Sequence, residues 1–187
     1  MFRHLMVPLD GSSFAEQAVP VAAEVARCSG AVLALVHVRS PDGQPAEVVG
    51  ASLASLGEFD ELAEAAYLES VRATIPAGVS TTSVTVAGPA IAPALSAHAR
   101  DRSADLIVMT THGRGGPARA WLGSVTDRLL REVETPVLLI RPSEHTAEPQ
   151  PADLFRRVLI PLEECTRTEK ILEPAIALGG LAKATYT

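Results

Sequence analysis

Lysine, cysteine and aromatic residues are scarce in this sequence. Aromatic residues make up 4% of the chain, so alanine, valine and leucine must fill most of its core. Lysine occurs only at Lys170 and Lys183, and a phosphate site earlier in the chain must therefore do without one. Cys28 and Cys165 lie far apart and provide no disulfide framework, which favours free thiols in a reducing cytosol.

Long apolar runs and a basic face are missing as well. No apolar stretch reaches the ~18 residues that a membrane-spanning helix needs, and the first apolar run stops at Pro8, too soon for a signal peptide. The formal net charge of -6 argues against general binding of nucleic acids or membrane surfaces. We therefore expect a cytoplasmic protein that binds neither nucleic acid nor membrane.

Short apolar runs alternate with amphipathic stretches along the first part of the chain. The runs that predict buried strands cover residues 5–9, 31–38, 79–86, 106–109 and 137–140. Helices are predicted over residues 14–28, 53–75, 90–100 and 123–132, the third of them interrupted near Pro93. This alternation predicts an α/β fold, a doubly wound, flavodoxin-like parallel sheet of five strands in the order 3-2-1-4-5.

Local signals add detail to these elements. Ser13 is followed three residues later by Glu16, which predicts a capping box, and Gly30 is the expected stop of the first helix. The alternation of valine with serine and threonine over 79–86 is typical of an edge strand. The acidic residues of the second helix are expected to form a solvated face: Glu58, Asp60, Glu61, Glu64 and Glu69.

The start of the chain has a second copy near its end. Residues 155–163, Phe-Arg-Arg-Val-Leu-Ile-Pro-Leu-Glu, repeat residues 2–10, Phe-Arg-His-Leu-Met-Val-Pro-Leu-Asp, at a constant offset. With one residue inserted, Pro174 then matches Pro20 inside a second apolar helix. We interpret this as a tandem repeat, and chance resemblance of two strand–helix starts is the alternative.

The repeat divides the chain into three parts. We expect a complete domain over residues 1–142, a proline-containing linker over 143–154, and an incomplete second copy over 155–187 with its first strand and helix only. The apolar faces of this second copy should dock on the first domain of its own chain or of a partner chain, since exposing them is costly, or else the copy should remain disordered. Glu163 replaces Asp10 and the following glycine is lost, which weakens the case for a second ligand site.

The segment from Met109 to Thr126 carries the richest chemistry of the chain. It leaves the end of the fourth predicted strand, where open α/β sheets bind ligands at a topological switch point. Gly113 allows close approach of the backbone. Gly123 and Ser124 open the next helix, whose free N–H groups and dipole favour an anion. These parts suit a polyphosphate, and the alternative is a glycine-rich loop that only joins strand to helix.

Positive charge for a phosphate site must come from arginine. The glycine-rich P-loop sequence with its lysine is absent, which argues against a P-loop NTPase. Arg114, Arg119, backbone amides and a bound cation would then balance the charge of the phosphates. Ser124 and Thr126 offer hydroxyl groups as further donors.

Three segments in sequence order resemble the universal stress protein family. They are Val-Pro-Leu-Asp-Gly-Ser at 7–12, His-Val at 37–38, and the stretch from Thr-His-Gly-Arg at 111–114 to Leu-Gly-Ser-Val at 122–125. The resemblance covers residues 2–141 and resumes weakly at 155. It implies a fold like that of the adenine-nucleotide α-hydrolases.

Nucleotide-binding members of this family share the pattern Gly-x-x-Gly, nine residues, then Gly-Ser or Gly-Thr. Gly113, the nine residues after it and Gly123-Ser124 match that pattern. The first glycine is replaced by Thr110, and we expect the Cβ atom there to narrow the space for ribose or phosphate.

The resemblance implies an ATP site, with Mg²⁺ or Mn²⁺ accompanying the nucleotide. Glycine and hydroxyl residues of the pattern would hold the phosphates, Asp10 would contact the ribose or a metal-bound phosphate, and Pro8 and Val38 would border the adenine. The expected set is Pro8, Asp10, Val38, Met109, Thr110, Gly113, Arg114, Gly123, Ser124, Val125 and Thr126.

Asp10, two histidines and the cysteines also have interpretations that involve no ligand or catalysis. Asp10 ends the first strand at the same edge as Thr110, where a carboxylate suits ribose hydroxyls, and its alternative role is an N-cap or Asx-turn for the first helix. His112 has no nucleophile or carboxylate at a recognisable spacing, which favours a packing role over catalysis. His37 is interpreted as a core histidine with its hydrogen bonds satisfied. Neither cysteine has the partners of a reactive thiol.

The sequence thus predicts an ATP-binding stress-response and energy-sensing module without dedicated catalysis, or with weak ATP hydrolysis at most. A nucleotide phosphohydrolase on the same scaffold and an interaction domain that binds no nucleotide are the alternatives. The fifth strand, Val137–Ile140, is short, apolar and expected at the sheet edge, which predicts a homodimer formed through this strand.

Overall fold

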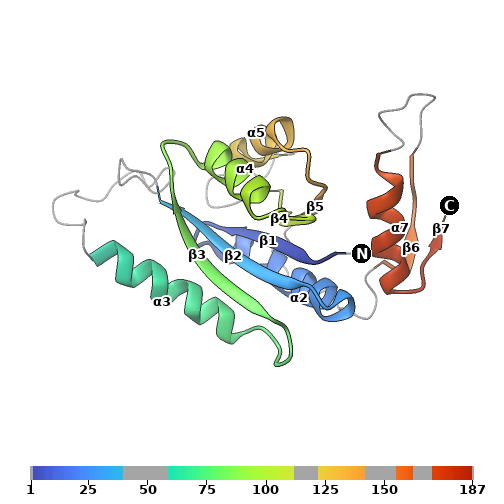
Figure 1. Ribbon diagram of the computed structural model, residues 1–187, viewed down its shortest axis with the longest axis horizontal. Helices are drawn as coiled ribbons and strands as arrows, with labels where there is room; N and C mark the ends of the chain where they lie inside the picture. The colour runs from blue at the N-terminus through green and yellow to red at the C-terminus, as the bar shows by residue number, and fades with distance from the viewer. Residues whose placement is uncertain (1, 40–58, 112–121, 142–154, 162–169, 187) are drawn as a thin grey trace.

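The computed structural model describes residues 2–39, 59–111, 122–141, 155–161 and 170–186 (Figure 1). The strands of its main sheet are β1 (His4–Leu9), β2 (Val32–Arg39), β3 (Thr81–Ala87), β4 (Leu106–Thr110) and β5 (Val137–Ile140). The helices between them are α1 (Ser13–Glu16), α2 (Ala18–Ser29), α3 (Phe59–Ala73), α4 (Ile91–Asp101) and α5 (Ser124–Glu132). Within these ranges no helix combines the length and the apolar character that crossing a membrane requires.

The main sheet has the order β3-β2-β1-β4-β5, and every neighbouring pair is parallel. This confirms the predicted doubly wound sheet, with β3 and β5 at its edges. Leu9 pairs with His37 at the end of the β1–β2 ladder, and Thr110 pairs with Ile140 at the end of β4 and β5. Because all strands run the same way, the segments that follow them meet at one edge of the sheet.

Helices cover both faces of this sheet (Figure 1). Leu5, Val7 and Val108 belong to the core that α2 and α3 cover, whereas Met6 and Ile107 belong to the core beneath α4 and α5. Burial on both faces explains why the central strands read as continuous apolar runs. Side chains alternate along each strand, so the face on which a residue lies follows from its position.

The first helix departs from the prediction in two ways. It breaks at Gln17 into α1 and α2, because Pro20 has no N–H for the carbonyl of Glu16 and its ring clashes with that group. Its N-cap is Ser12 rather than Ser13, and the Ala15 N–H donates to the Ser12 hydroxyl over 3.1 Å. The predicted capping box is therefore wrong, because the third residue after the N-cap is Ala15 and not Glu16.

Two other local predictions have clear outcomes. Helix α2 stops, as expected, at Gly30, which adopts the left-handed conformation with φ of 71° that glycine tolerates. Helix α4 continues through Pro93 without the expected interruption. Pro93 lies in the first turn, where its missing N–H would have had no partner within the helix.

Residues 155–186 contain a small parallel unit of their own. It comprises β6 (Arg157–Val158), α7 (Leu172–Leu181) and β7 (Thr185–Tyr186), with β6 and β7 paired. The short strand β7 is an addition to the strand and helix that we expected. Phe155, Leu178 and Leu181 pack against the core beneath α2, so the unit docks on the first domain of its own chain.

Candidate functional site

The carboxyl ends of β1 and β4 lie side by side in the centre of the sheet. Asp10 and Gly11 follow β1, and Thr111 follows β4. The first helix contacts both strands, so the two connections form one continuous region of the sheet edge. This region is the switch point at which the chain changes from one face of the sheet to the other.

The turn after β1 holds the Asp10 carboxylate in place. Its Oδ1 atom accepts hydrogen bonds from the Ser12 N–H over 2.9 Å and from the Ser12 hydroxyl over 2.6 Å. Gly11 adopts φ of 78°, a conformation that favours glycine. The predicted Asx-turn role of Asp10 is thus confirmed, and the residue stays exposed to solvent at the sheet edge. An exposed carboxylate held in this way suits ligand hydroxyls or a metal-bound phosphate.

The start of α5 is built differently. Gly123 is its N-cap in an extended conformation, with φ of -70° and ψ of 156°, and no side chain of the described residues caps this helix. The Gly123 N–H donates to the Thr111 carbonyl oxygen over 2.7 Å, which fixes the helix start to the end of β4. Ser124 opens the helix and is exposed. N–H groups in the first turn of such a helix, together with its dipole, favour an anion.

Several predicted residues share one face of the sheet edge. Val38 and Met109 belong to the core beneath α4 and α5, Val125 packs against the same core, and alternation along β1 places Pro8 on this face as well. Gly123 and Ser124 begin the helix that covers this face. The structure therefore brings these six expected residues together on one side of the edge.

Thr110 and Thr126 lie differently from the others. Thr110 follows Leu106 and Val108 in the alternation of β4, which places it on the opposite face, and it is only 5% exposed. Thr126 is buried, and its hydroxyl donates to the Thr110 carbonyl oxygen over 3.3 Å. This bond braces α5 against β4. The remaining predicted residues, Gly113 and Arg114, lie outside the described residues, as does His112.

Helix α3 contributes residues that the sequence did not single out. The Arg39 guanidinium pairs with the Glu64 carboxylate at 2.6 Å, and Glu64 is only 15% exposed. The expected solvated position of Glu64 is thus wrong, because β2 brings Arg39 against it. His37 Nδ1 donates to the Leu9 carbonyl oxygen over 2.9 Å, as expected for a satisfied histidine. The charged stretch of α3 gives no sequence signal that one of its members faces β2.

Tyr67 lies one turn after Glu64 and points to the turn that follows β1. Burial, followed by the charge of the nearby Glu16 carboxylate, raises the pKa of the Tyr67 hydroxyl well above its ordinary value. The charge of Asp10 acts in the same direction. The hydroxyl is therefore protonated at neutral pH and offers a hydrogen-bond donor rather than a base.

Metal-binding groupings are not found in the described parts of the chain. Among those residues, no three histidine, cysteine, aspartate or glutamate side chains gather closely enough to hold a metal ion. Burial, and next the Glu24 carboxylate, raise the pKa of the Cys28 thiol, so it stays protonated at neutral pH. A protonated thiol is a weak nucleophile.

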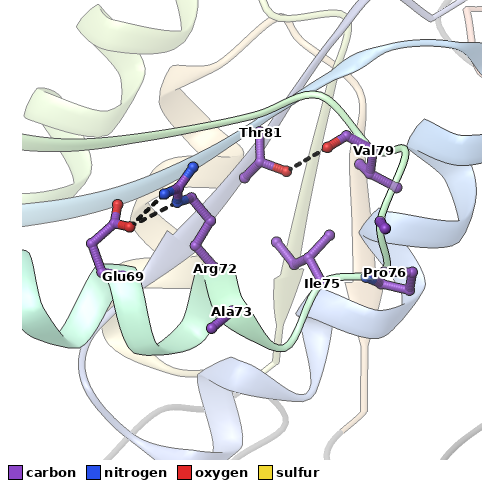
Figure 2. Close-up of a pocket in the computed structure, with 8 residues that line it drawn as sticks. Glu69, Arg72, Ala73, Ile75, Pro76, Val79 and Thr81 are labelled. Atoms are coloured by element: carbon purple, nitrogen blue, oxygen red, sulfur yellow. Dashed lines mark hydrogen bonds and ion pairs between the residues drawn. The ribbon is translucent and has the colours of Figure 1, made fainter.

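A cavity of about 230 Å³ lies at the carboxyl end of α3 (Figure 2). It lies where α3 leads into β3, beside the exposed ion pair of Glu69 and Arg72 and next to Pro76 and Thr81. Since β3 begins at Thr81, the cavity is at the amino edge of the sheet. It is therefore separate from the region around Asp10 and Gly123.

Comparisons with known proteins agree with the fold. The universal stress protein family model matches residues 1–141. A universal stress protein of Mycobacterium tuberculosis is 32% identical over 139 residues, which are 74% of this chain and 45% of that protein. The chain thus spans about half the length of this relative.

Solved structures show the same architecture. A universal stress protein in complex with cAMP has a TM-score of 0.58 at 25% identity, covering 76% of this chain and 98% of that one. A universal stress protein from Archaeoglobus fulgidus DSM 4304 has a TM-score of 0.65 at 16% identity, covering 98% of this chain and 63% of that one. The second likeness extends the shared fold to the unit formed by β6, α7 and β7. Because the family model matches residues 1–141, which are more than half of the chain, this chain belongs to the universal stress protein family.

Proposed function

We propose that this protein binds ATP at the carboxyl edge of β1 and β4, as a stress-response and energy-sensing module without dedicated catalysis. The observation that carries the proposal is that the same sheet edge holds a fixed, exposed carboxylate at Asp10 and a helix start at Gly123 that no side chain of the described residues caps. The relative solved in complex with cAMP supports an adenine nucleotide as the ligand class.

Each half of the ligand has suitable partners in this arrangement. Ribose hydroxyls can donate to the Asp10 carboxylate, and phosphate oxygens can accept from the N–H groups at the start of α5. Pro8, Val38 and Met109 supply an apolar border for the adenine on the same face. Gly113 and Arg114, which the family pattern assigns to the phosphates, belong to this proposal through the sequence alone.

Mg²⁺ or Mn²⁺ is proposed to arrive with the nucleotide. These cations prefer oxygen ligands, and phosphate oxygens together with the Asp10 carboxylate would supply them. The described residues hold no separate metal-binding group that would retain the cation alone. The exposed Cys28 thiol fits the reducing conditions of the cytoplasm, where we place the protein.

Mass spectrometry of nucleotides released by denaturing freshly purified protein tests the proposal, with calorimetric titration of ATP and MgCl₂ as the quantitative measurement. We expect retained ATP and saturable binding with one site per chain. Retained ADP or AMP with steady turnover would instead favour a nucleotide phosphohydrolase on the same scaffold. An empty protein that also fails to bind added ATP would favour the interaction domain.

We further propose that two chains associate through β5, which forms an open edge of the sheet. The Pro136 and Ile140 carbonyl oxygens accept from β4, so the backbone groups of Val137 and Leu139 point away from the sheet. An apolar edge strand with unpaired backbone groups favours association with a second copy.

Substitution of Leu139 separates edge pairing from side-chain packing. Leu139→Pro removes an outward N–H that could pair with a partner strand, while Leu139→Ala loses similar packing and keeps the N–H. Multi-angle light scattering should give a dimer for the natural chain and for Leu139→Ala, and a monomer for Leu139→Pro. A monomeric natural chain, or a dimer in all three, would contradict association through β5.

A further inference from the structure

His37 joins the ends of the two strands that border the proposed adenine site. It pairs in register with Leu9, the residue before Asp10, and it precedes Val38 on β2. Its Nδ1 atom lies 2.9 Å from the Leu9 carbonyl oxygen. A carbonyl oxygen only accepts, so Nδ1 must carry the proton and donate it. The other ring nitrogen, Nε2, is then left facing Glu64.

This bond lies at the end of the β1–β2 ladder. Leu9 and His37 are the last paired residues of the two strands, where the regular backbone hydrogen bonds stop. The imidazole N–H adds a side-chain hydrogen bond to the Leu9 carbonyl at this last pair of the ladder. The bond therefore helps to set the spacing between the strand ends that carry Asp10 and Val38.

Helix α3 places the Glu64 carboxylate beside the imidazole ring. The Glu64 Oε1 atom is 3.9 Å from His37 Nε2, and Glu64 is itself fixed by Arg39, whose Nη2 atom lies 2.6 Å from Oε2 and whose Nε atom lies 3.1 Å from the same oxygen. The side chains of His37 and Glu64 are 20% and 15% exposed. The Arg39–Glu64 pair is charge-assisted, and it keeps the Glu64 carboxylate beside the ring.

We propose that His37, with the Glu64 carboxylate beside its ring, is a positioning residue for the adenine nucleotide. It lies on the face of the sheet that α3 covers, whereas Val38 lies on the opposite face with Met109. His37 therefore acts through the Leu9 carbonyl and not by touching the ligand. This inference rests on the proposed ATP site, because its effect is on the geometry of that site.

Two substitutions of His37 isolate the hydrogen bond. In His37→Asn the amide nitrogen takes the place of Nδ1 and can still donate to Leu9, whereas His37→Leu fills similar space without a donor. We expect ATP to bind about five- to tenfold more weakly to His37→Leu, the size of one lost hydrogen bond. Binding to His37→Asn should stay within about twofold of the natural chain, with calorimetric titration as the measurement.

A matched pair of substitutions in α3 tests the role of Glu64. Glu64→Gln weakens the contact with Arg39 and removes the charge beside the ring, and we expect about threefold weaker ATP binding. Glu69→Gln breaks the exposed ion pair with Arg72 at the far end of the same helix (Figure 2) and should leave ATP binding unchanged. The melting temperature without nucleotide, measured for each variant, reports any general loss of stability.

The outcomes separate the inference from the proposed function. Rescue by His37→Asn together with the difference between Glu64→Gln and Glu69→Gln supports it. Equal loss of affinity in His37→Asn and His37→Leu, or unchanged affinity in both, overturns it while ATP binding itself stands. If His37→Leu is too unstable to measure, an affinity of Glu64→Gln equal to that of Glu69→Gln overturns it alone. A natural chain that binds no ATP overturns both proposals.

Discussion

Two helices begin at the carboxyl edge of neighbouring central strands, and their starts are built in opposite ways. At the turn between β1 and α1, the hydroxyl of Ser12 accepts from the Ala15 N–H and donates to Asp10, so side chains close this helix start. At α5 the cap is Gly123, and no side chain of the described residues takes that place. We call the first helix start closed, because side chains cap it beside an acidic residue. We call the second open, because no side chain of the described residues caps it.

The difference assigns separate tasks to the two connections. The closed turn uses its polar groups to fix one carboxylate, which then faces solvent in a defined position. No side chain of the described residues caps the second helix start, where first-turn N–H groups and the helix dipole favour an anion. A ligand with hydroxyls at one end and phosphates at the other needs both. The predictions below change one connection at a time, from the largest expected effect on ATP binding to the smallest.

Adding a side chain at the start of α5 should have the largest effect on ATP affinity. Gly123→Val places a branched side chain at the cap of α5, where we propose that phosphate lies, and we expect ATP affinity to fall at least about a hundredfold. The φ and ψ of Gly123 are in the extended region that valine adopts without strain, so the fold should survive. Calorimetric titration and a melting curve without nucleotide check both statements.

The size of the new side chain provides the control. Gly123→Ala adds a single methyl group at the same backbone position and should weaken ATP binding less than Gly123→Val does. Affinities of both variants equal to that of the natural chain would mean that phosphate does not approach this helix start. A melting curve that collapses in both would instead show a structural role for Gly123.

Removing the side-chain cap of α1 should affect the stability of the fold more than ATP binding. Ser12→Ala removes the cap of Ala15 and one hydrogen bond to Asp10, and we expect a loss of about 1 kcal/mol in the free energy of unfolding. ATP binding should weaken about threefold, because Asp10 keeps its bond to the Ser12 N–H. Urea denaturation measures the first effect and calorimetry the second.

Ser13→Ala is the matched control for this change, since Ser13 is exposed and is not the cap. We expect both its stability and its ATP affinity to equal those of the natural chain. Equal destabilisation by Ser12→Ala and Ser13→Ala would contradict the assignment of the cap to Ser12.

The strand order and its edges were predictable because each central strand is apolar on both faces, a pattern that only a sheet covered on both sides explains. Asp10 and Gly123 were predictable for the same reason, since parallel strands bring their following segments to one edge. The break at Gln17 escaped periodicity. It arises from one carbonyl opposite Pro20, and apolar spacing carries no information about that clash.

The role of α3 could not be predicted, because it depends on pairing across the fold. Arg39 and Glu64 are 25 residues apart, and nothing in the acidic stretch of α3 distinguishes Glu64 from its solvated neighbours. The face of the sheet on which Thr110 lies was predictable from the sequence, however. Counting by twos along β4 places it with Leu106 and Val108, opposite Met109, and this signal was available in the sequence.

Thr110 is the position where the family pattern and the structure lead to different predictions. The pattern has glycine there, and a Cβ atom that crowds the ligand would make Thr110→Gly bind ATP more tightly. In the structure the residue is 5% exposed and lies on the face away from Met109 and α5. Removing its side chain should then leave ATP affinity within about twofold and lower the free energy of unfolding by about 1–3 kcal/mol, through lost packing and the flexibility of glycine.

Thr110→Ser provides the comparison for this last change, because it keeps the hydroxyl and the Cβ atom and removes only the methyl group. It should lie between the natural chain and Thr110→Gly in stability and match both in ATP affinity. Calorimetric titration together with urea denaturation of the three proteins decides the point. Tighter binding in Thr110→Gly alone would show that the Cβ atom reaches the ligand, and the two connections would then meet more closely than alternation along β4 implies.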